Sequence, residues 1–471
     1  MKEAKKGCPV CESNHTSYEF QVGIRRIERC QDCNVLFESS LFSDDRTGNL
    51  KVRLHKSNVI TPVIESKARV SQCIERLKDR GIKQGDCLWI GGNGHIQFVD
   101  DAKDRGFDVA DIDLESVGTN TVDACVLLEN LGKDEYPLEQ LLSVWKVLKP
   151  GGLLLATIPT LDSTEARRQT SRWDQFASGR LTYFDCHGLS ALLVRAGYRQ
   201  IMMCSEVEGV IVVCQKDNRI DSRPLLSIVL PVYNESATFE QLMNLVLEKK
   251  FDDIDREIII VESNSTDGSR ELVQQYETHS GVKVIYENES RGKGHAVKNG
   301  LNHASGDIIL IQDADLEYDI EDYDALLDPI ANYRRLFVLG SRHKGHWKMR
   351  KFEDRSLLSA VFNCGQVIFT WLINIACGTQ LKDPFTMYKV FHRECLYGLQ
   401  LESNRFDLDW EIVIKFIRKG LVPLEIPVNY WSRSFGEGKK VRPFLDPVLW
   451  IIALLKFRYG KLYHSATSGK M

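Results

Sequence analysis

The sequence has no marked excess of charge of either sign. Lysine and arginine together number 61, aspartate and glutamate 65, and the formal net charge at pH 7 is −4. Proteins that bind nucleic acid usually carry a basic excess, so we expect no nucleic-acid partner. The first residues, Met1 to Lys6, are charged and lack the apolar run of a signal peptide. These absences favour a cytoplasmic protein.

Apolar runs that could span a membrane are also scarce. Residues 357–377 carry no charge and are long enough to span, but they include Asn363, Gln366 and Asn374. A helix that is buried or lies at an interface therefore fits this segment better. Residues 447–455 are too short to span, and their tryptophan and the cations that follow predict either an interfacial anchor or a core helix. No terminal transmembrane helix follows, so we expect a soluble or peripheral protein.

Disulfides are not expected in a chain without an export signal, so the 13 cysteines need another explanation. Four of them form two pairs, Cys8-x-x-Cys11 and Cys30-x-x-Cys33, with the spacing of a four-thiolate zinc ribbon. Four thiolates close a tetrahedral site, so the zinc would be structural. A thioredoxin-like redox site is the alternative, but it needs one pair in a βαβ unit. We predict a zinc ribbon over residues 1–45.

The segment 308–317, I-I-L-I-Q-D-A-D-L-E, is the most informative part of the chain. Its apolar residues predict a buried strand that runs into Asp313 and Asp315. Residues two apart on a strand point to the same side, and two such carboxylates repel each other unless a cation lies between them. A hard divalent ion, Mg²⁺ or Mn²⁺, shared with substrate phosphates fits this position. Without further evidence, a D-x-D sequence is more often a solvated turn.

Three other apolar strands support the metal interpretation. We predict them at 226–232, 257–261 and 282–286, each followed by polar or charged residues. Strands that alternate with helical stretches predict a parallel sheet, and such sheets bind ligands beyond the carboxyl ends of their strands. The polar residues at these ends suit a nucleoside diphosphate and its metal ion.

Residues from about 225 to 460 resemble a family-2 glycosyltransferase with the GT-A fold, and most closely the dolichyl- or polyprenyl-phosphate sugar synthases. We place this domain at 225–465. The resemblance rests on nine segments in the family's order: L-P-V-Y-N-E (230–235), E-S-N-S-T-D-G-S (262–269), R-G-K-G-H-A (291–296), Q-D-A-D-L-E-Y-D (312–319), G-S-R (340–342), R-S-L-L-S-A-V-F-N (355–363), D-P-F-T-M-Y-K-V-F (383–391), F-D-L-D-W-E-I (406–412) and R-S-F-G-E-G-K-K (433–440).

The resemblance implies roles for the residues at matching positions. Asp313 and Asp315 would bind Mg²⁺ or Mn²⁺, with Glu317 as a third possible oxygen ligand. Family members often carry a second aspartate where Ser263 stands, which leaves the base preference open. The residues that would bind the sugar nucleotide are Pro231, Tyr233, Glu235, Glu262, Asp267, Lys293 and Asp313.

The acceptor decides which further residues are needed. A hydroxyl acceptor needs a general base, whereas a lipid phosphate is already an anion and needs cations that hold it. The resemblance supplies candidates for both. The acceptor-phosphate residues would be Arg342, Arg355, Arg433 and Lys439, followed by Lys440, and the candidate catalytic residues are Asp313, Asp315, Asp409, Glu411 and Arg433.

The predicted activity is a metal-dependent, inverting transfer of a sugar from a nucleoside diphosphate to a polyprenyl phosphate at the inner face of the membrane. A transferase in the same fold that acts on a glycan hydroxyl, with Asp409 or Glu411 as base, is the first alternative. A bifunctional methyltransferase–glycosyltransferase is the second. A non-enzymatic scaffold would leave the charged residues at the strand ends unexplained.

Residues 66–214 resemble a class I methyltransferase in their later motifs, 122–131, 147–159 and 183–198. The motif that binds S-adenosylmethionine in that family is poor, because Trp89 stands in place of an acidic residue. Asn93 and His95 stand in place of glycines whose missing side chains let the cofactor approach the backbone.

The segment 66–214 is also too short in one place to contain all the elements of an intact methyltransferase. Asp113 remains at the position that binds the ribose, but the next strand begins at Thr121. An intact enzyme would need a helix and a strand between them, and a helix alone averages about 11 residues. We therefore predict a degenerate Rossmann-like domain and regard S-adenosylmethionine as an improbable cofactor. The polar stretch 215–224 is predicted to be the linker to the transferase. The whole chain is expected to be of the α/β class.

Overall fold

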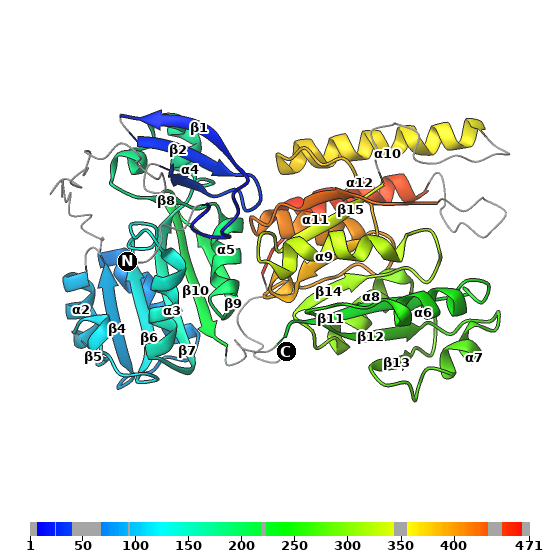
Figure 1. Ribbon diagram of the computed structural model, residues 1–471, viewed down its shortest axis with the longest axis horizontal. Helices are drawn as coiled ribbons and strands as arrows, with labels where there is room; N and C mark the ends of the chain where they lie inside the picture. Colours follow the sequence, from blue (N-terminus) through cyan, green and yellow to red (C-terminus); the bar gives the residue numbers. More distant parts are fainter. Residues whose placement is uncertain are drawn as a thin grey trace. The chain divides into compact units, whose positions relative to one another are not determined.

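The computed structural model describes residues 7–23, 25–39, 67–92, 95–110, 112–217, 223–342, 356–431 and 445–463. The chain divides into two compact units, one of residues 1–221 with 466–471 and one of residues 222–465 (Figure 1). The described part of the first unit contains two sheets and that of the second unit one, and each unit has its own hydrophobic core.

The first unit begins with a small antiparallel sheet of strand order β1-β2-β3-β8. Its strands are β1 (Thr16–Val22), β2 (Arg25–Cys30), β3 (Leu36–Glu38) and β8 (Thr182–Tyr183). Because β8 comes from much later in the chain, this sheet is built into the rest of the unit. Ile27 and Leu36 pack there against Trp173, Phe176 and Tyr183.

The second sheet of this unit has six strands in the order β5-β4-β6-β7-β10-β9. The first four are parallel, and β10 is antiparallel to both β7 and β9. The strands are β4 (Cys87–Gly92), β5 (Asp108–Ala110), β6 (Val122–Leu128), β7 (Leu148–Pro159), β9 (Tyr198–Ser205) and β10 (Gly209–Lys216). The helices are α1 (Lys67–Asp79), α2 (His95–Asp104), α3 (Pro137–Val147), α4 (Thr164–Gln169) and α5 (Cys186–Arg195).

The connection between β5 and β6 is short. Its described residues, 112–121, form a single 3₁₀ turn, η2 (Leu114–Ser116), where a complete Rossmann unit would have a helix and another strand.

The second unit is built on a mixed sheet of seven strands in the order β13-β12-β11-β14-β16-β15-β17. The strands are β11 (Leu225–Val232), β12 (Asp255–Glu262), β13 (Val282–Tyr286), β14 (Ile308–Ile311), β15 (Phe337–Ser341), β16 (Lys389–His392) and β17 (Leu424–Pro427). The first four in spatial order are parallel, as the alternation of strands and helices predicts. β16 runs antiparallel to β14 and β15, so the direction of the sheet reverses beside β14. A parallel sheet with such a reversal leaves its ligand site at the carboxyl ends of the parallel strands.

The helices of the second unit are α6 (Phe239–Glu248), α7 (Ser269–Gln274), α8 (Lys293–His303), α9 (Tyr323–Ala331), α10 (Ser356–Cys377), α11 (Leu408–Arg418) and α12 (Leu445–Tyr459) (Figure 1). α8 packs so closely on the sheet that only glycine fits at position 300. A Cβ added at Gly300 would lie 2.4 Å from Cγ1 of Val229. α10, α11 and α12 pack together through Phe369, Ile373, Trp410 and Phe457. None of the helices among the described residues is both long enough and apolar enough to cross a membrane.

Candidate active site

The carboxyl end of β14 brings together the acidic pair and a lysine. Asp313 and Asp315 follow the strand, and Asp315 is buried and accepts a hydrogen bond from the backbone N–H of Glu317 at 3.1 Å. Lys293, the first residue of α8, forms an ion pair with Asp313. Burial lowers the pKa of Lys293, but the charges of Asp313, Asp409 and Asp315 outweigh it, so the pKa is raised. The side chain therefore remains an ammonium among carboxylates.

The glycines around Lys293 are required by packing. Gly292 has a φ of 103°, a conformation that suits glycine. A Cβ on Gly292 would lie 2.6 Å from the carbonyl oxygen of Asn404, and one on Gly294 would lie 2.6 Å from that of Arg405. The two glycines thus let the chain just before α11 lie against the start of α8, which brings Lys293 near the first turn of α11.

A buried ion pair lies beside this cluster. Lys389, at the start of β16, places its Nζ 3.1 Å from Oδ1 of Asp409 and also donates to the carbonyl oxygen of Thr386. Burial lowers the pKa of Lys389 in spite of the nearby carboxylate. Burial raises the pKa of Asp409 more than the charges of Lys389 and Lys293 lower it, so this pKa is raised overall. Sequence reasoning gave Lys389 no role, although a lysine in an otherwise apolar strand is a signal.

The other candidate base, Glu411, makes its contacts with residues other than those around Asp313. It is fully buried and forms an ion pair with Lys415 at 2.6 Å. Its two oxygens also accept the backbone N–H groups of Glu402 and Ser403, each at 2.7 Å. Glu411 therefore holds the preceding loop on α11, and the structure brings Asp409, but not Glu411, to the cluster of Lys293 and Asp313.

The loops after β11 and β12 are joined by hydrogen bonds. The N–H of Asn234 donates to Oγ of Ser265 at 3.0 Å, and the N–H of Ser236 donates to Asp267 at 3.0 Å. Burial raises the pKa of Asp267, but bonds from Ser269 and Ser236 outweigh this and lower it to about 2. Asp267 is thus an ionised carboxylate that fixes the loop. The predicted nucleotide residues Pro231, Tyr233 and Glu235 lie in and just after β11, at this edge of the sheet.

Glu262 ends β12 and is fully buried. Its oxygens accept the N–H groups of Ser265 at 2.6 Å and Asn264 at 3.2 Å, and it forms an ion pair with Arg270 at 2.9 Å. Glu262 therefore fixes the loop that follows β12 through three internal partners.

Two residues near the end of β12 were missed by sequence reasoning. Glu287 is buried directly after β13, and its carboxylate accepts hydrogen bonds from Ser263 at 2.8 Å and from Asn299 at 3.1 Å. His295, on the first turn of α8, lies with its Nδ1 at 2.7 Å from the same carboxylate. The histidine stands inside the R-G-K-G-H-A segment, which was its only signal.

The predicted acceptor residues are only partly described. Arg342 is nearly buried and forms a two-pronged pair with Asp383, with Nε–Oδ2 and Nη2–Oδ1 distances of 2.8 Å each. Burial lowers the pKa of Arg342, but the charge of Asp383 outweighs it and raises the pKa well above its usual value. The guanidinium also lies over the ring of Tyr430. The other predicted acceptor residues, Arg355, Arg433, Lys439 and Lys440, lie outside the described residues.

Glu317, the third possible metal ligand, accepts a hydrogen bond from the hydroxyl of Tyr430 at 2.7 Å. Burial and the charge of Glu317 raise the pKa of Tyr430, so the hydroxyl keeps its proton. This bond and the stacking of Arg342 on the same ring link the acidic segment after β14 to the predicted acceptor side.

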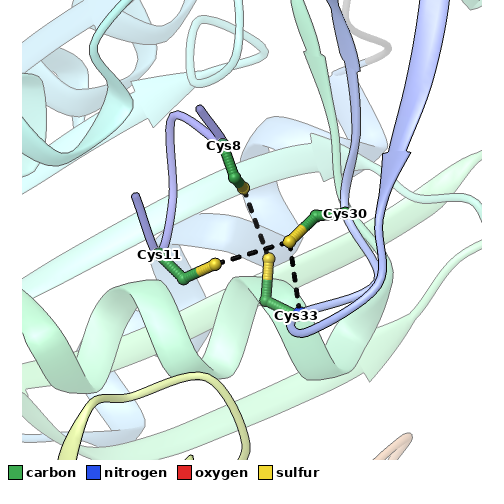
Figure 2. Close-up of side chains that lie close together, drawn as sticks. All are labelled: Cys8, Cys11, Cys30 and Cys33. Atoms are coloured by element: carbon green, nitrogen blue, oxygen red, sulfur yellow. Dashed lines mark hydrogen bonds between the residues drawn. The ribbon is translucent and has the colours of Figure 1, made fainter. Parts of the chain in front are cut away.

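In the first unit, Figure 2 shows Cys8 and Cys11 facing Cys30 and Cys33. The four Sγ atoms lie within 4.8 Å of one another, with 3.5 Å between Cys8 and Cys33 and between Cys11 and Cys30. Tetrahedral zinc with bonds of about 2.3 Å would place its sulfurs roughly 3.8 Å apart. The backbone N–H of Cys33 also donates to the sulfur of Cys30 at 3.5 Å. The arrangement therefore suits one tetrahedral metal ion.

An aromatic side chain fills the space beside the carboxyl end of β4. A Cβ added at Gly91 would lie 2.3 Å from Cη2 of Trp89, and the indole Nε1 donates to the carbonyl oxygen of Ile112 at 2.9 Å. The indole therefore extends from β4 to the chain that follows β5. Asp113 lies at the start of η2 and makes no capping bond with its side chain. Asn93 and the side chain of His95 lie outside the described residues.

Comparison with known proteins links the second unit to one family. Residues 227–397 match the family model described as "Glycosyl transferase family 2". A dolichol-phosphate mannosyltransferase of Pyrococcus furiosus is 28% identical over 233 residues, which are 49% of this chain and 64% of that protein. A dolichyl-phosphate beta-glucosyltransferase of Dictyostelium discoideum is 28% identical over 251 residues, which are 50% of this chain and 74% of that protein. The chain thus spans less than two thirds of the Pyrococcus relative.

Among solved structures, glucosyl-3-phosphoglycerate synthase from Mycobacterium tuberculosis in complex with uridine diphosphate matches 50% of this chain and 80% of its own, with 21% identity and a TM-score of 0.38. The family match covers the parallel strands, the acidic pair and the lysine of α8. These similarities support a glycosyltransferase of family 2 as the class of the second unit.

Proposed function

We propose that the domain at 225–465 transfers a sugar from a nucleoside-diphosphate sugar to a polyprenyl phosphate, with inversion at the anomeric carbon. The observation that carries this choice of acceptor is the ion pair between Lys389 and Asp409. A general base must take a proton, and protonation of Asp409 would leave the buried ammonium of Lys389 without its anionic partner. An acceptor phosphate needs no base. The names of the relatives, which are transferases to dolichyl phosphate, support the same acceptor.

The donor would bind across the carboxyl ends of β11 to β14. Asp313 and Asp315 would hold Mg²⁺ or Mn²⁺, with Glu317 within the same segment. The fit to a cation is supported by Lys293, whose ammonium already lies against Asp313. When bound, the metal would act as a Lewis acid that neutralises the departing diphosphate. Lys293 would then turn from Asp313 to the diphosphate, and the first turn of α8 would favour the same negative charge.

The acceptor phosphate would attack the anomeric carbon from the face opposite the diphosphate. A new C–O bond would form as the bond to the leaving oxygen breaks, and no proton would be transferred. Arg342 is nearly buried and already paired with Asp383, so we assign the main contacts to Arg355, Arg433 and Lys439. A guanidinium can hold a phosphate with two parallel hydrogen bonds.

An apolar face on the second unit supports a peripheral position at the membrane. On α10, Ile368, Trp371 and Ile375 are spaced as one face of a helix, and 61% of Trp371 is exposed. On α12, the exposed residues are Ile451, Ile452, Leu455 and Tyr459. Large exposed apolar faces mark contact surfaces, and aromatic residues suit the boundary between lipid and water. Both helices pack on α11, which carries Asp409.

A hydroxyl of a glycan is the second candidate acceptor. The position of Asp409 at the cluster around Asp313 favours this acceptor, since Asp409 could serve as its base. Burial also raises the pKa of Asp409. A carboxylate with a raised pKa is a better base.

For the first unit we propose a structural role. Residues 1–45 would form a zinc ribbon, with Zn²⁺ on Cys8, Cys11, Cys30 and Cys33. Residues 66–214 would form a methyltransferase-like domain that does not bind S-adenosylmethionine. Trp89 supports this, because its indole fills the space over Gly91, where the backbone of a working site must be open to the cofactor. The residues at the end of β4 do not fit the cofactor.

The experiment compares two acceptors that differ only in the phosphate. Purified enzyme is given a panel of sugar nucleotides with Mg²⁺ and either a polyprenyl phosphate or the matching polyprenol. Transfer to the phosphate alone supports the proposal. Transfer to the polyprenol, with none to the phosphate, would refute it.

A further inference from the structure

The carboxylate of Glu287 joins three elements at the edge of the sheet. It accepts the hydroxyl of Ser263 at the end of β12, and it accepts His295 and Asn299 from α8. Glu287 itself directly follows β13 and is 6% exposed. These donors come from two other elements, the end of β12 and α8, so Glu287 positions them relative to each other.

The contact with Glu287 determines which nitrogen of His295 carries hydrogen. An ionised carboxylate can only accept, so Nδ1 of His295 must be the donor. In the neutral ring, Nε2 is then an acceptor with a free lone pair. Among the residues that the structure describes, none makes a hydrogen bond to this Nε2, and 29% of the side chain is exposed. The exposed nitrogen is therefore oriented and available for a ligand.

The position of His295 indicates which part of a ligand it meets. Lys293 and His295 are two apart on α8, which turns them about 200° from each other around the helix. Lys293 reaches Asp313 after β14, whereas His295 reaches Glu287 after β13. In the strand order β13-β12-β11-β14 these are opposite ends of the parallel part of the sheet. A diphosphate held at Asp313 and Lys293 would place its nucleoside toward β12 and β13.

We propose that His295 binds the nucleoside of the sugar donor through Nε2, which accepts a base N–H or a ribose O–H, and that Glu287 positions the ring for this contact. The inference rests on the proposed function and adds to it a residue that selects the donor. Uracil and guanine each carry a ring N–H that can donate to such an acceptor.

Two substitutions separate binding from packing. In His295→Asn the amide nitrogen replaces Nδ1 and can still donate to Glu287, but the acceptor at Nε2 is gone. In His295→Gln the longer amide places an oxygen near the former Nε2. His303→Asn is the matched control, because His303 is on the same helix, is exposed, and bonds only the carbonyl oxygen of Asn299 among the described residues.

The measurement is calorimetric titration of the full chain with UDP and with GDP in the presence of MgCl₂. Loss of one neutral hydrogen bond should weaken binding of the preferred nucleotide about three- to tenfold in His295→Asn. His295→Gln should stay within about twofold of the wild type, and His303→Asn should not differ from it. Equal affinity of His295→Asn and wild type would overturn the inference.

A second measurement follows binding to the wild type and uses a variant only to assign a resonance. In ¹⁵N-histidine spectra of the wild type, the preferred nucleotide should shift one Nε2 resonance, identified by its absence from His295→Gln. No shift of that resonance on saturation would refute the contact. If wild type binds neither UDP nor GDP, the proposed donor site itself is wrong.

Discussion

The Lys389–Asp409 pair gives the sharpest test of the acceptor. Asp409→Asn removes the carboxylate charge and leaves the buried Lys389 ammonium with an amide oxygen and the carbonyl of Thr386. Removing one partner of a buried ion pair destabilises a protein by about 3–5 kcal/mol. Because both remaining oxygens still accept from Lys389, we expect the lower end, about 3 kcal/mol. With a phosphate acceptor, the rate of transfer should fall less than about tenfold, since no proton is removed.

Glu411→Gln is the matched control for this substitution. Its partner Lys415 is equally buried and lies 2.6 Å away, and it keeps the carbonyl oxygen of Gln400. Its loss of stability should therefore resemble that of Asp409→Asn, while its position away from Asp313 should leave catalysis unchanged. The assays are urea denaturation of the full chain and the initial rate of transfer to polyprenyl phosphate at saturating donor. A fall of about 10²–10⁴-fold in Asp409→Asn, with Glu411→Gln near wild type, is the signature of a general base and would refute the phosphate mechanism.

Four further predictions follow from the two units. Asp315→Ala should abolish transfer without unfolding the second unit, because the residue lies beyond a strand end; transfer in EDTA equal to that in Mg²⁺ would contradict the metal site. Wild-type protein should show no micromolar binding of S-adenosylmethionine by calorimetry, about −8 kcal/mol, and such binding would favour the bifunctional enzyme. Cys30→Ser should lose the metal found by elemental analysis and lower the melting temperature, whereas Cys87→Ser, outside the cluster, should retain it. Trp371→Glu combined with Ile375→Glu should reduce sedimentation with anionic phospholipid vesicles, while Val207→Glu, equally exposed in the first unit, should not; unchanged sedimentation would argue against the α10 face.

The strands that carry the site could be predicted from the sequence because their signal is local. The predicted strands at 226–232, 257–261 and 282–286 correspond to β11, β12 and β13, and the acidic pair follows β14 as expected. An apolar run with polar residues at its end indicates that the strand is buried, and it indicates at which edge of the sheet ligands bind. The family resemblance added the order of the motifs, and residues 227–397, which hold seven of the nine segments, match the family model.

The partners of the charged residues could not be predicted, since ion pairs depend on distances between segments far apart in the chain. Asp383 pairs with Arg342 across 41 positions, and Asp409 with Lys389 across 20. A motif gives the residue type at a position but does not reveal whether another side chain already neutralises its charge. For this reason the sequence presented Asp409 and Glu411 as equivalent candidates, although their surroundings differ.

These partners also change what the predicted residues can do. A carboxylate or guanidinium with a strong internal partner already has much of its charge neutralised, which reduces the net gain from binding a ligand. Glu262 with Arg270 and Arg342 with Asp383 are of this kind. Lys293 differs, because a metal ion bound at Asp313 would replace its ammonium and release it toward the diphosphate. Donor binding and metal binding should therefore be mutually dependent: the affinity for UDP or GDP should rise when Mg²⁺ is added, and Lys293→Met should reduce that rise. Equal nucleotide affinity with and without Mg²⁺ would show that Lys293 and the metal ion do not exchange at Asp313.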